Sequence, residues 1–269
     1  MTLLDENFVL SNQIEIPKVG LGTWQISNDD VYQVILDALD VGYRHIDTAQ
    51  GYRNEEAIGR ALKDSGLGRD RYFITSKLPS HIKGYEQTLK SFKKTMKDLQ
   101  LEVLDLYLIH APWPWNEIGK DCTAGNIESF KAMIDLYHQG KIRSIGVSNF
   151  SISDIQAVID ATGFVPHVNQ IRFYVSDTQE DLVSYCKQKN ILVEAYSPLA
   201  TGRILENPRL HHIATTKGVT IAQLCIRYCL EKGTLPLPKT TKKERMIENA
   251  QLDFTLSSDE LTLLDQLKL

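Results

Sequence analysis

The feature that most constrains the fold is an alternation of short β-branched or apolar runs with segments of helical spacing, at a period of roughly thirty residues. Eight such runs are found, at Val19–Thr23, His45–Thr48, Tyr72–Leu78, Leu104–His110, Ser144–Ser148, Val168–Phe173, Leu192–Ser197 and Thr234–Pro238. Because they are apolar almost throughout, we expect strands buried on both faces, which is typical of parallel sheets with right-handed helical crossovers. The pattern therefore predicts an α/β fold.

The segments between the runs carry helix signals. In the first, one apolar face recurs at positions i, i+3, i+4, i+7 and i+8, formed by Val31, Val34, Ile35, Ala38 and Leu39. Ser151 with Asp154 predicts a capped helix start, and Ser257 with Glu260 predicts a capping box for the last helix.

The length of 269 residues suits a closed barrel. Eight strand and helix units in about 250 residues match a (β/α)8 TIM barrel better than a doubly wound sheet, which would usually have fewer strands. With no linker or shift in composition, we predict one barrel domain over residues 1–269. The segment Phe8–Ile16 predicts an N-terminal β-hairpin around Ser11-Asn12-Gln13 that closes the barrel floor.

Composition argues against several classes of protein. The formal net charge of −4 argues against nucleic-acid binding, which usually needs a basic domain. The acidic N-terminus lacks a secretory signal, and no apolar run approaches the roughly 18 residues of a membrane span. The four cysteines show no disulfide framework or metal-ligand spacing. We therefore expect a cytoplasmic protein without a metal site and, since nothing indicates oligomers, a monomer.

Ionisable side chains follow three neighbouring strands. Asp47, Lys77 and His110 come at the ends of the second, third and fourth runs, and Tyr52 follows five residues after Asp47. A solvated loop would explain any one of them alone. In a barrel, however, the carboxyl ends of all strands form the rim that carries the active site. We therefore expect the four groups to converge there.

Such a group of side chains suits carbonyl reduction. A free tyrosine titrates near 10, and a neighbouring ammonium lowers that pKa by roughly one to three units. We therefore predict Tyr52 as proton donor beside Lys77, with Asp47 keeping Lys77 charged and His110 orienting the substrate oxygen. No side chain can supply hydride, so a nicotinamide cofactor is required.

The cofactor must be held by the barrel itself, because neither GxGxxG after a strand nor a P-loop is present. Polar and aromatic side chains at the ends of the fifth to seventh runs can bind an amide ring: Ser148, Asn149, Gln170, Tyr196 and Ser197.

A basic segment, Leu237–Arg245, follows the eighth run and enters a helix. Cations at a helix N-terminus are disfavoured unless an anion is bound there. We predict a phosphate site formed by Lys239 and Arg245, with Thr240 or Thr241 as helix cap, and hence NADPH rather than NADH. A solvated basic patch is the alternative.

At this point the chain resembles the aldo-keto reductase family over nearly its whole length. The matching segments are Gly20–Trp24, Asp47–Glu55, Ser76–Leu78, Leu106–His110, Gly146–Phe150, Val168–Gln170, Ala195–Leu199 and Pro238–Thr240. The family's catalytic tetrad maps onto Asp47, Tyr52, Lys77 and His110 without substitution. The resemblance implies NADPH-dependent reduction of aldehydes or ketones, such as small carbonyl compounds and keto-sugars, to alcohols.

The resemblance also implies cofactor contacts. The nicotinamide would stack on Tyr196, with its carboxamide held by Ser148, Asn149 and Gln170, and the pyrophosphate would lie along Ser197–Leu199. The remaining implied contacts are Thr23 and Trp24 in the first motif and Lys239, Thr240, Thr241, Arg245, Glu248 and Asn249 in the last.

Three departures from the family pattern affect the substrate pocket. Ala111 stands where members often have tryptophan, so one aromatic wall of the pocket is either missing or supplied by Trp113 or Trp115, and Trp24 is a further expected substrate contact. Arg172–Val175 replaces the usual Glu-Tyr-His-Pro. The chain also stops soon after its final helix, as in the bacterial branch that includes diketogluconate and glyoxal reductases. We predict an open pocket and a broad substrate range.

Two other functions remain open. One is a barrel isomerase or lyase whose lysine forms a Schiff base while the basic segment holds a substrate phosphate. The other is a cofactor-binding regulatory member of the same family.

Overall fold

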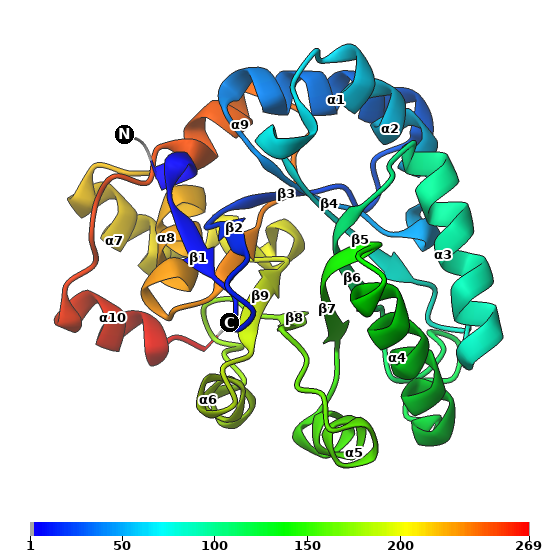
Figure 1. The fold of residues 1–269 in the computed structure, drawn as a ribbon. Coiled ribbons are helices and arrows are strands. Elements are labelled where there is room, and N and C mark those ends of the chain that lie inside the picture. The colour runs from blue at the N-terminus through cyan, green and yellow to red at the C-terminus, as the bar shows by residue number, and fades with distance from the viewer. Residues whose placement is uncertain (1–2, 269) are drawn as a thin grey trace.

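The structure is a computed structural model, and it describes residues 3–268. Its main sheet has eight parallel strands, namely β3 (Gly20–Gly22), β4 (His45–Asp47), β5 (Phe73–Leu78), β6 (Leu104–Ile109), β7 (Ile142–Ser148), β8 (Val168–Arg172), β9 (Leu192–Tyr196) and β10 (Leu235–Leu237). Each strand pairs with the next along the chain, and the backbone N–H of Gly22 donates to Pro238 O at 3.0 Å where the two ends of the sheet meet. The predicted (β/α)8 barrel is confirmed (Figure 1).

Helices cover the outside of the barrel. Within residues 3–268 these are α1 (Asn28–Val41), α2 (Glu55–Asp64), α3 (Tyr85–Leu99), α4 (Thr123–His138), α5 (Ile152–Thr162), α6 (Glu180–Gln188), α7 (Pro208–Lys217), α8 (Ile221–Glu231), α9 (Lys243–Ala250) and α10 (Ser258–Asp265). Short 3-10 turns are η1 (Leu3–Asp5), η2 (Gln50–Tyr52), η3 (Arg69–Arg71) and η4 (Ala200–Glu206). The capping boxes of α5 and α10 begin at Ser151 and Ser257, as predicted.

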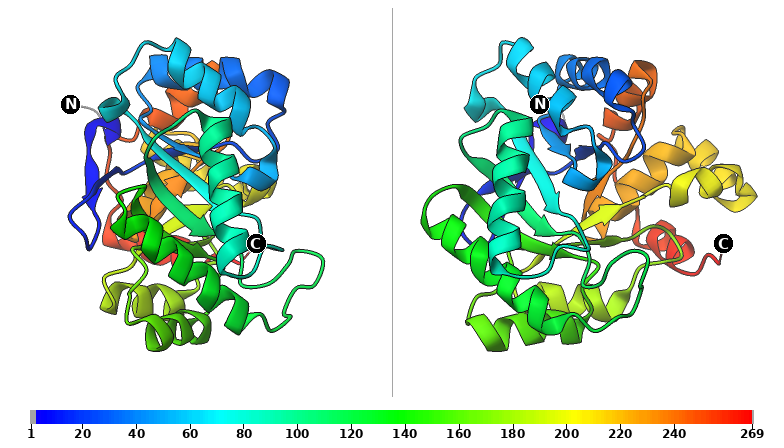
Figure 2. Two further views of the ribbon diagram at one scale, coloured as in Figure 1. Left: turned by 45° about the vertical axis from the view of Figure 1, so that its right-hand side comes forward. Right: turned by 90° about the vertical axis from the view of Figure 1, so that its right-hand side faces the viewer.

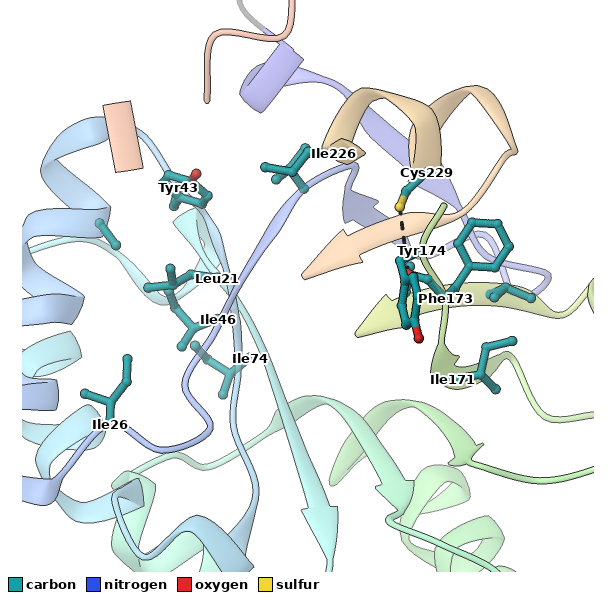
Figure 3. Close-up of a cluster of buried hydrophobic side chains, with 14 of the residues drawn as sticks. Leu21, Ile26, Tyr43, Ile46, Ile74, Ile171, Phe173, Tyr174, Ile226 and Cys229 are labelled. Carbon is teal, nitrogen blue, oxygen red and sulfur yellow. Dashed lines mark hydrogen bonds between the residues drawn. The ribbon is translucent and has the colours of Figure 1, made fainter. Parts of the chain in front are cut away.

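Alternation along the strands decides which side chains enter the barrel. Leu21, Ile46 and Ile74 are register neighbours on β3, β4 and β5, and lie side by side in the cluster that packs against the helices (Figure 3). Successive strand residues point to opposite faces. Asp47 and Lys77 differ from these positions by an odd number of residues, so both point into the barrel.

The N-terminal hairpin closes the floor of the barrel, as predicted. It pairs β1 (Asn7–Val9) with β2 (Glu15–Pro17), and its Leu10 and Ile16 pack against inward side chains such as Phe73 and Leu106. Asn12 Nδ2 donates to Arg143 O at 2.9 Å, beside the start of β7. The left view of Figure 2 shows the hairpin at one end of the barrel and the loop after β6 at the other. The mouth of the barrel, where the strands end in polar residues, is therefore the end opposite the hairpin.

No helix within the described range is long and apolar enough to cross a membrane.

Candidate active site

The side chains predicted for the rim lie together at the mouth. Asp47 is the last residue of β4, Lys77 lies near the end of β5, His110 directly follows β6, and η2 ends at Tyr52. Asp47, Tyr52 and His110 line a cavity of about 1530 Å³, whereas Lys77 is fully buried behind them.

Lys77 is fixed by a buried ion pair. Its Nζ donates to Asp47 Oδ1 at 2.7 Å and to Thr48 O at 2.9 Å, and lies 3.4 Å from the Tyr52 hydroxyl. Burial alone would lower the pKa of Lys77, but its neighbours, first among them the ion-paired Asp47, raise it above its usual value. The ammonium therefore stays charged beside the phenol.

Tyr52 is protonated at neutral pH. Burial raises the pKa of Tyr52 by more than the nearby Lys77 lowers it, so its net direction is upward. The expectation that Lys77 would bring that pKa below 10 is wrong, because the cost of burying a phenolate is the larger effect. A proton donor has to carry its proton, so this state suits the predicted role, and Lys77 stabilises the oxygen only as negative charge develops there.

His110 is neutral and close to the same hydroxyl. Its Nε2 lies 3.5 Å from Tyr52 Oη, and the two rings meet edge to face. Burial, assisted by the charge of Lys77, holds the pKa of His110 well below 6.5. A neutral imidazole can donate one hydrogen bond to a substrate oxygen but is not an acid at neutral pH.

The wall assigned to the nicotinamide is held by its own hydrogen bonds. Ser148 Oγ donates to Gln170 O at 2.8 Å, and Asn149 Nδ2 donates to His110 O at 3.0 Å. Tyr196 Oη donates to Asn149 Oδ1 at 2.8 Å. All four residues that sequence reasoning placed here, Ser148, Asn149, Gln170 and Tyr196, line the cavity. The side chains of this wall are therefore held in place by the protein itself.

One residue buried behind this wall is not predicted by the sequence pattern. Gln170 Nε2 donates both to Asp47 Oδ2 at 2.8 Å and to Glu194 Oε2 at 2.7 Å. Glu194 lies inside an apolar run, and the sequence pattern predicts no role for it. Its position two residues before Tyr196 gives it the same inward direction, which was the one signal available.

The basic segment lines the same cavity as the tetrad. Its lining here comprises Lys239, Thr240, Thr241, Arg245, Glu248 and Asn249. Glu248 also accepts a hydrogen bond from Thr220 Oγ1 at 2.8 Å. Both cations and hydroxyl groups suited to a phosphate are thus present.

The predicted capping of α9 by Thr240 or Thr241 is wrong. The helix begins at Lys243 with Lys242 as its cap residue, and no side chain caps it. Thr240 Oγ1 instead accepts from the backbone N–H of Lys242 at 3.1 Å, because that turn precedes the helix. Lys243 pairs with Asp40 at 2.6 Å, away from the cavity lining.

Only some of the aromatic residues that were predicted for the substrate pocket line the cavity. Trp24 and Trp115 line the cavity and are about half exposed, and Trp115 meets His110 edge to face. Trp113 is outside the lining and packs edge-on against Trp115, with ring centroids 5.0 Å apart. Thr23 is also outside it, because its hydroxyl donates to Asp47 O at 2.9 Å. The structure therefore brings neither Trp113 nor Thr23 to the cavity wall.

The loop after β9 completes the lining. Ser197 and Leu199 both border the cavity, as predicted, and Ser197 adopts a positive φ of 53°. In the described part of the chain, no group of three or more His, Cys, Asp or Glu side chains could hold a metal ion.

Comparison with known proteins gives concordant matches. A family model described as "Aldo/keto reductase family" matches residues 18–268. Glyoxal reductase of Bacillus subtilis is 40% identical over 268 residues, which covers 99% of this chain and 94% of the relative. An aldo/keto reductase structure from Brucella melitensis superposes with a TM-score of 0.93 at 37% identity, covering 99% of this chain and 98% of that one. A Bombyx mori aldo-keto reductase solved in complex with NADP gives a TM-score of 0.89 at 32% identity, covering 97% and 92%.

Proposed function

Because the chain belongs to the aldo/keto reductase family, we propose that Tyr52 supplies the proton when this NADP-dependent oxidoreductase reduces small aldehydes and ketones. The observation that carries the proposal is the placement of the Tyr52 hydroxyl on the cavity wall, 3.4 Å from Lys77 Nζ and 3.5 Å from His110 Nε2. Since a relative is named glyoxal reductase, α-oxoaldehydes are the first substrates to test.

The tetrad divides the chemistry among its members. Bound NADPH would supply hydride to the carbonyl carbon. Neutral His110 would donate a hydrogen bond that orients the carbonyl oxygen. Tyr52 would pass its proton to that oxygen, and Lys77, held by Asp47, would stabilise the charge left on the phenol.

The cavity residues fit this cofactor. Tyr196 offers a ring face for the nicotinamide, and Ser148, Asn149 and Gln170 offer polar groups for its carboxamide. Ser197 and Leu199 would border the pyrophosphate, with Trp24 at the substrate side. The phosphate end would be held by Lys239, Thr240, Thr241, Arg245, Glu248 and Asn249.

The geometry does not favour a Schiff-base enzyme. Lys77 is fully buried, charged and occupied by Asp47 and Thr48 O, whereas an amine nucleophile must be uncharged and accessible. A regulatory protein of this family would also bind NADPH, and it would differ from the proposed enzyme only in that it reduces no carbonyl compound.

The test is oxidation of NADPH, followed by its absorbance, with glyoxal, methylglyoxal and a panel of aldehydes and ketones. We expect turnover by the native protein and a loss of about 10²- to 10⁴-fold in kcat for Tyr52→Phe, because general acid catalysis contributes that much. NADPH affinity, measured by fluorescence quenching, should be nearly unchanged in that variant.

Two results would contradict the proposal. Turnover by Tyr52→Phe within tenfold of the native rate would remove Tyr52 as proton donor. Tight NADPH binding with no turnover of any carbonyl compound would favour the regulatory role.

That residues 1–269 act as one barrel domain, as a monomer and in the cytoplasm, with a broad substrate range, stays a prediction. The single continuous sheet and the open mouth lined by Trp24 and Trp115 support the first and last points.

A further inference from the structure

Glu194 is a fully buried carboxyl group inside the barrel, next to the proposed active site. Its β9 position is in register with Gln170 on β8 and with Leu235 on β10. Its Oε2 accepts from Gln170 Nε2 at 2.7 Å, and the same nitrogen donates to Asp47 Oδ2 at 2.8 Å. One amide group therefore joins two carboxyl groups.

The direction of this amide follows from Asp47. Asp47 forms an ion pair with Lys77, and the second oxygen of a carboxylate in an ion pair can only accept a hydrogen bond. The NH2 group of Gln170 must therefore face Asp47, and its second hydrogen is taken by Glu194. Gln170 lines the cavity, and it can therefore present its carbonyl Oε1 to a ligand there as a hydrogen-bond acceptor.

The surroundings of Glu194 favour its neutral form. Lys77, on β5, is already paired with Asp47 at 2.7 Å, and Leu235 is apolar. His45, on β4, has its Nε2 3.9 Å from Glu194 Oε1, but burial and Lys77 lower its pKa to about 3, so that it is uncharged. Its Nε2 lies 2.9 Å from Thr75 Oγ1.

Glu194 itself lacks a full set of partners. Among the described residues, its Oε1 makes no hydrogen bond. A buried carboxylate without a paired cation is costly, and a proton on Oε1 removes that cost. Burial and the charge of Asp47 accordingly raise the pKa of Glu194 from 4.5 to about 8.

We propose that Glu194 is a positioning residue of the active site, whose neutral form keeps the Gln170 amide against Asp47 with its carbonyl toward the cofactor. This inference rests on the proposed function, because it assigns the cavity side of Gln170 to the nicotinamide. Ionised Glu194 would place a second carboxylate on the same NH2 group, and the two like charges would repel each other across the amide. It would also place a second anion near Lys77, which partly offsets the positive charge that this ammonium presents to Tyr52.

The sign of the pH effect is fixed by this geometry. Below about pH 8 Glu194 is neutral and the wall is intact, whereas above it the carboxylate forms. We therefore expect both NADPH affinity and kcat to fall as the pH rises through about 8.

The experiment compares the native protein with Glu194→Gln and Glu194→Leu from pH 6 to 10, measuring the Kd for NADPH and kcat. The glutamine stays neutral and its carbonyl still accepts from Gln170, so it should match the native protein at pH 7 and lose the alkaline decline. The leucine is neutral but offers no acceptor, so its Kd should rise about threefold to tenfold at every pH, with kcat little changed.

An alkaline decline with the same midpoint in Glu194→Gln would overturn the inference, and so would a native Kd for NADPH that does not change between pH 7 and 9. If the native protein reduces no carbonyl compound, the proposed function fails. The Kd profiles still decide the role of Glu194 in that case.

A second measurement needs no cofactor and serves if the glutamine variant does not fold. A carboxyl group with a raised pKa keeps its proton in the folded state at pH values where the unfolded chain has released it, so stability falls from about pH 4.5 to 8. The melting temperature of the native protein should therefore fall relative to Glu194→Leu over that range. Parallel profiles would overturn the neutral form.

Discussion

Replacing Lys77 by methionine would test whether the buried ammonium sets the acidity of Tyr52. The Lys77 Nζ lies 3.4 Å from the phenol oxygen, and at an effective dielectric of roughly 20 that distance gives about 5 kcal/mol for a full charge pair. The same ammonium also serves Asp47 at 2.7 Å, so we expect about 3 to 4 kcal/mol to act on the phenol. Proton donation in Lys77→Met should then be about 10² to 10³ times slower.

The same substitution leaves Asp47 buried, at 4% exposure, with a hydrogen bond from Gln170 but no cation. Removing one partner of a buried ion pair typically costs about 3 to 5 kcal/mol of folding free energy. The double variant Asp47→Asn/Lys77→Met removes the unpaired charge. It should recover much of that stability without recovering activity.

The assay measures kcat by NADPH oxidation with one carbonyl substrate, the Kd for NADPH by fluorescence, and the free energy of unfolding in urea. We expect low activity in both the single and the double variant, but a large loss of stability only in the single variant. A kcat of Lys77→Met within tenfold of the native value would refute the electrostatic role of Lys77. Recovery of activity in the double variant would show that the single variant fails only because it is destabilised.

Two further predictions concern the cofactor and the floor. Arg245→Ala should weaken NADPH about tenfold to a hundredfold more than NADH, because charge-assisted bonds to the 2′-phosphate are lost, whereas Lys243→Ala, whose ammonium pairs with Asp40, should change neither Kd. Equal losses for both cofactors would show that Arg245 does not contact the 2′-phosphate. Leu10→Ala should cost about 2 to 5 kcal/mol in urea unfolding because Leu10 is 2% exposed in the floor cluster, with the 60% exposed Val9→Ala as control. A loss below about 1 kcal/mol would mean that the hairpin contributes little to closing the barrel.

The barrel and the position of the tetrad could be predicted because both follow from local patterns. Buried parallel strands are apolar almost throughout, and the bounds of each predicted run agree with those of a strand to within two residues. The rule that functional groups follow such strands then brought Asp47, Lys77 and His110 together. Tyr52 could be added because it follows Asp47 in the chain by only five residues.

Other features depend on contacts that local patterns do not contain. The bond between Gln170 and Glu194 joins residues 24 positions apart whose strands are neighbours in register, so it appears only when the sheet is assembled. The sequence offers no reason to prefer Trp113 or Trp115 as part of the cavity wall. The conformation of the loop decides that Trp115 lines the cavity. The sequence identified Lys77 as the charge near Tyr52 but not the depth of burial, which reverses the net direction of the Tyr52 pKa.

The burial of Lys77 also explains why Tyr52, and not Lys77, is the residue that faces the substrate. Lys77 is fully buried while Tyr52 borders the cavity, so the phenol lies between the ammonium and any bound substrate. With solvent excluded around it, the ammonium acts on the phenol through a medium that screens charge far less than bulk water does. It cannot itself reach a carbonyl carbon, which separates this lysine from the accessible amine of a Schiff-base enzyme. An exposed lysine at the same position would be screened and free to react, so the depth of Lys77 contributes as much to the expected chemistry as its charge.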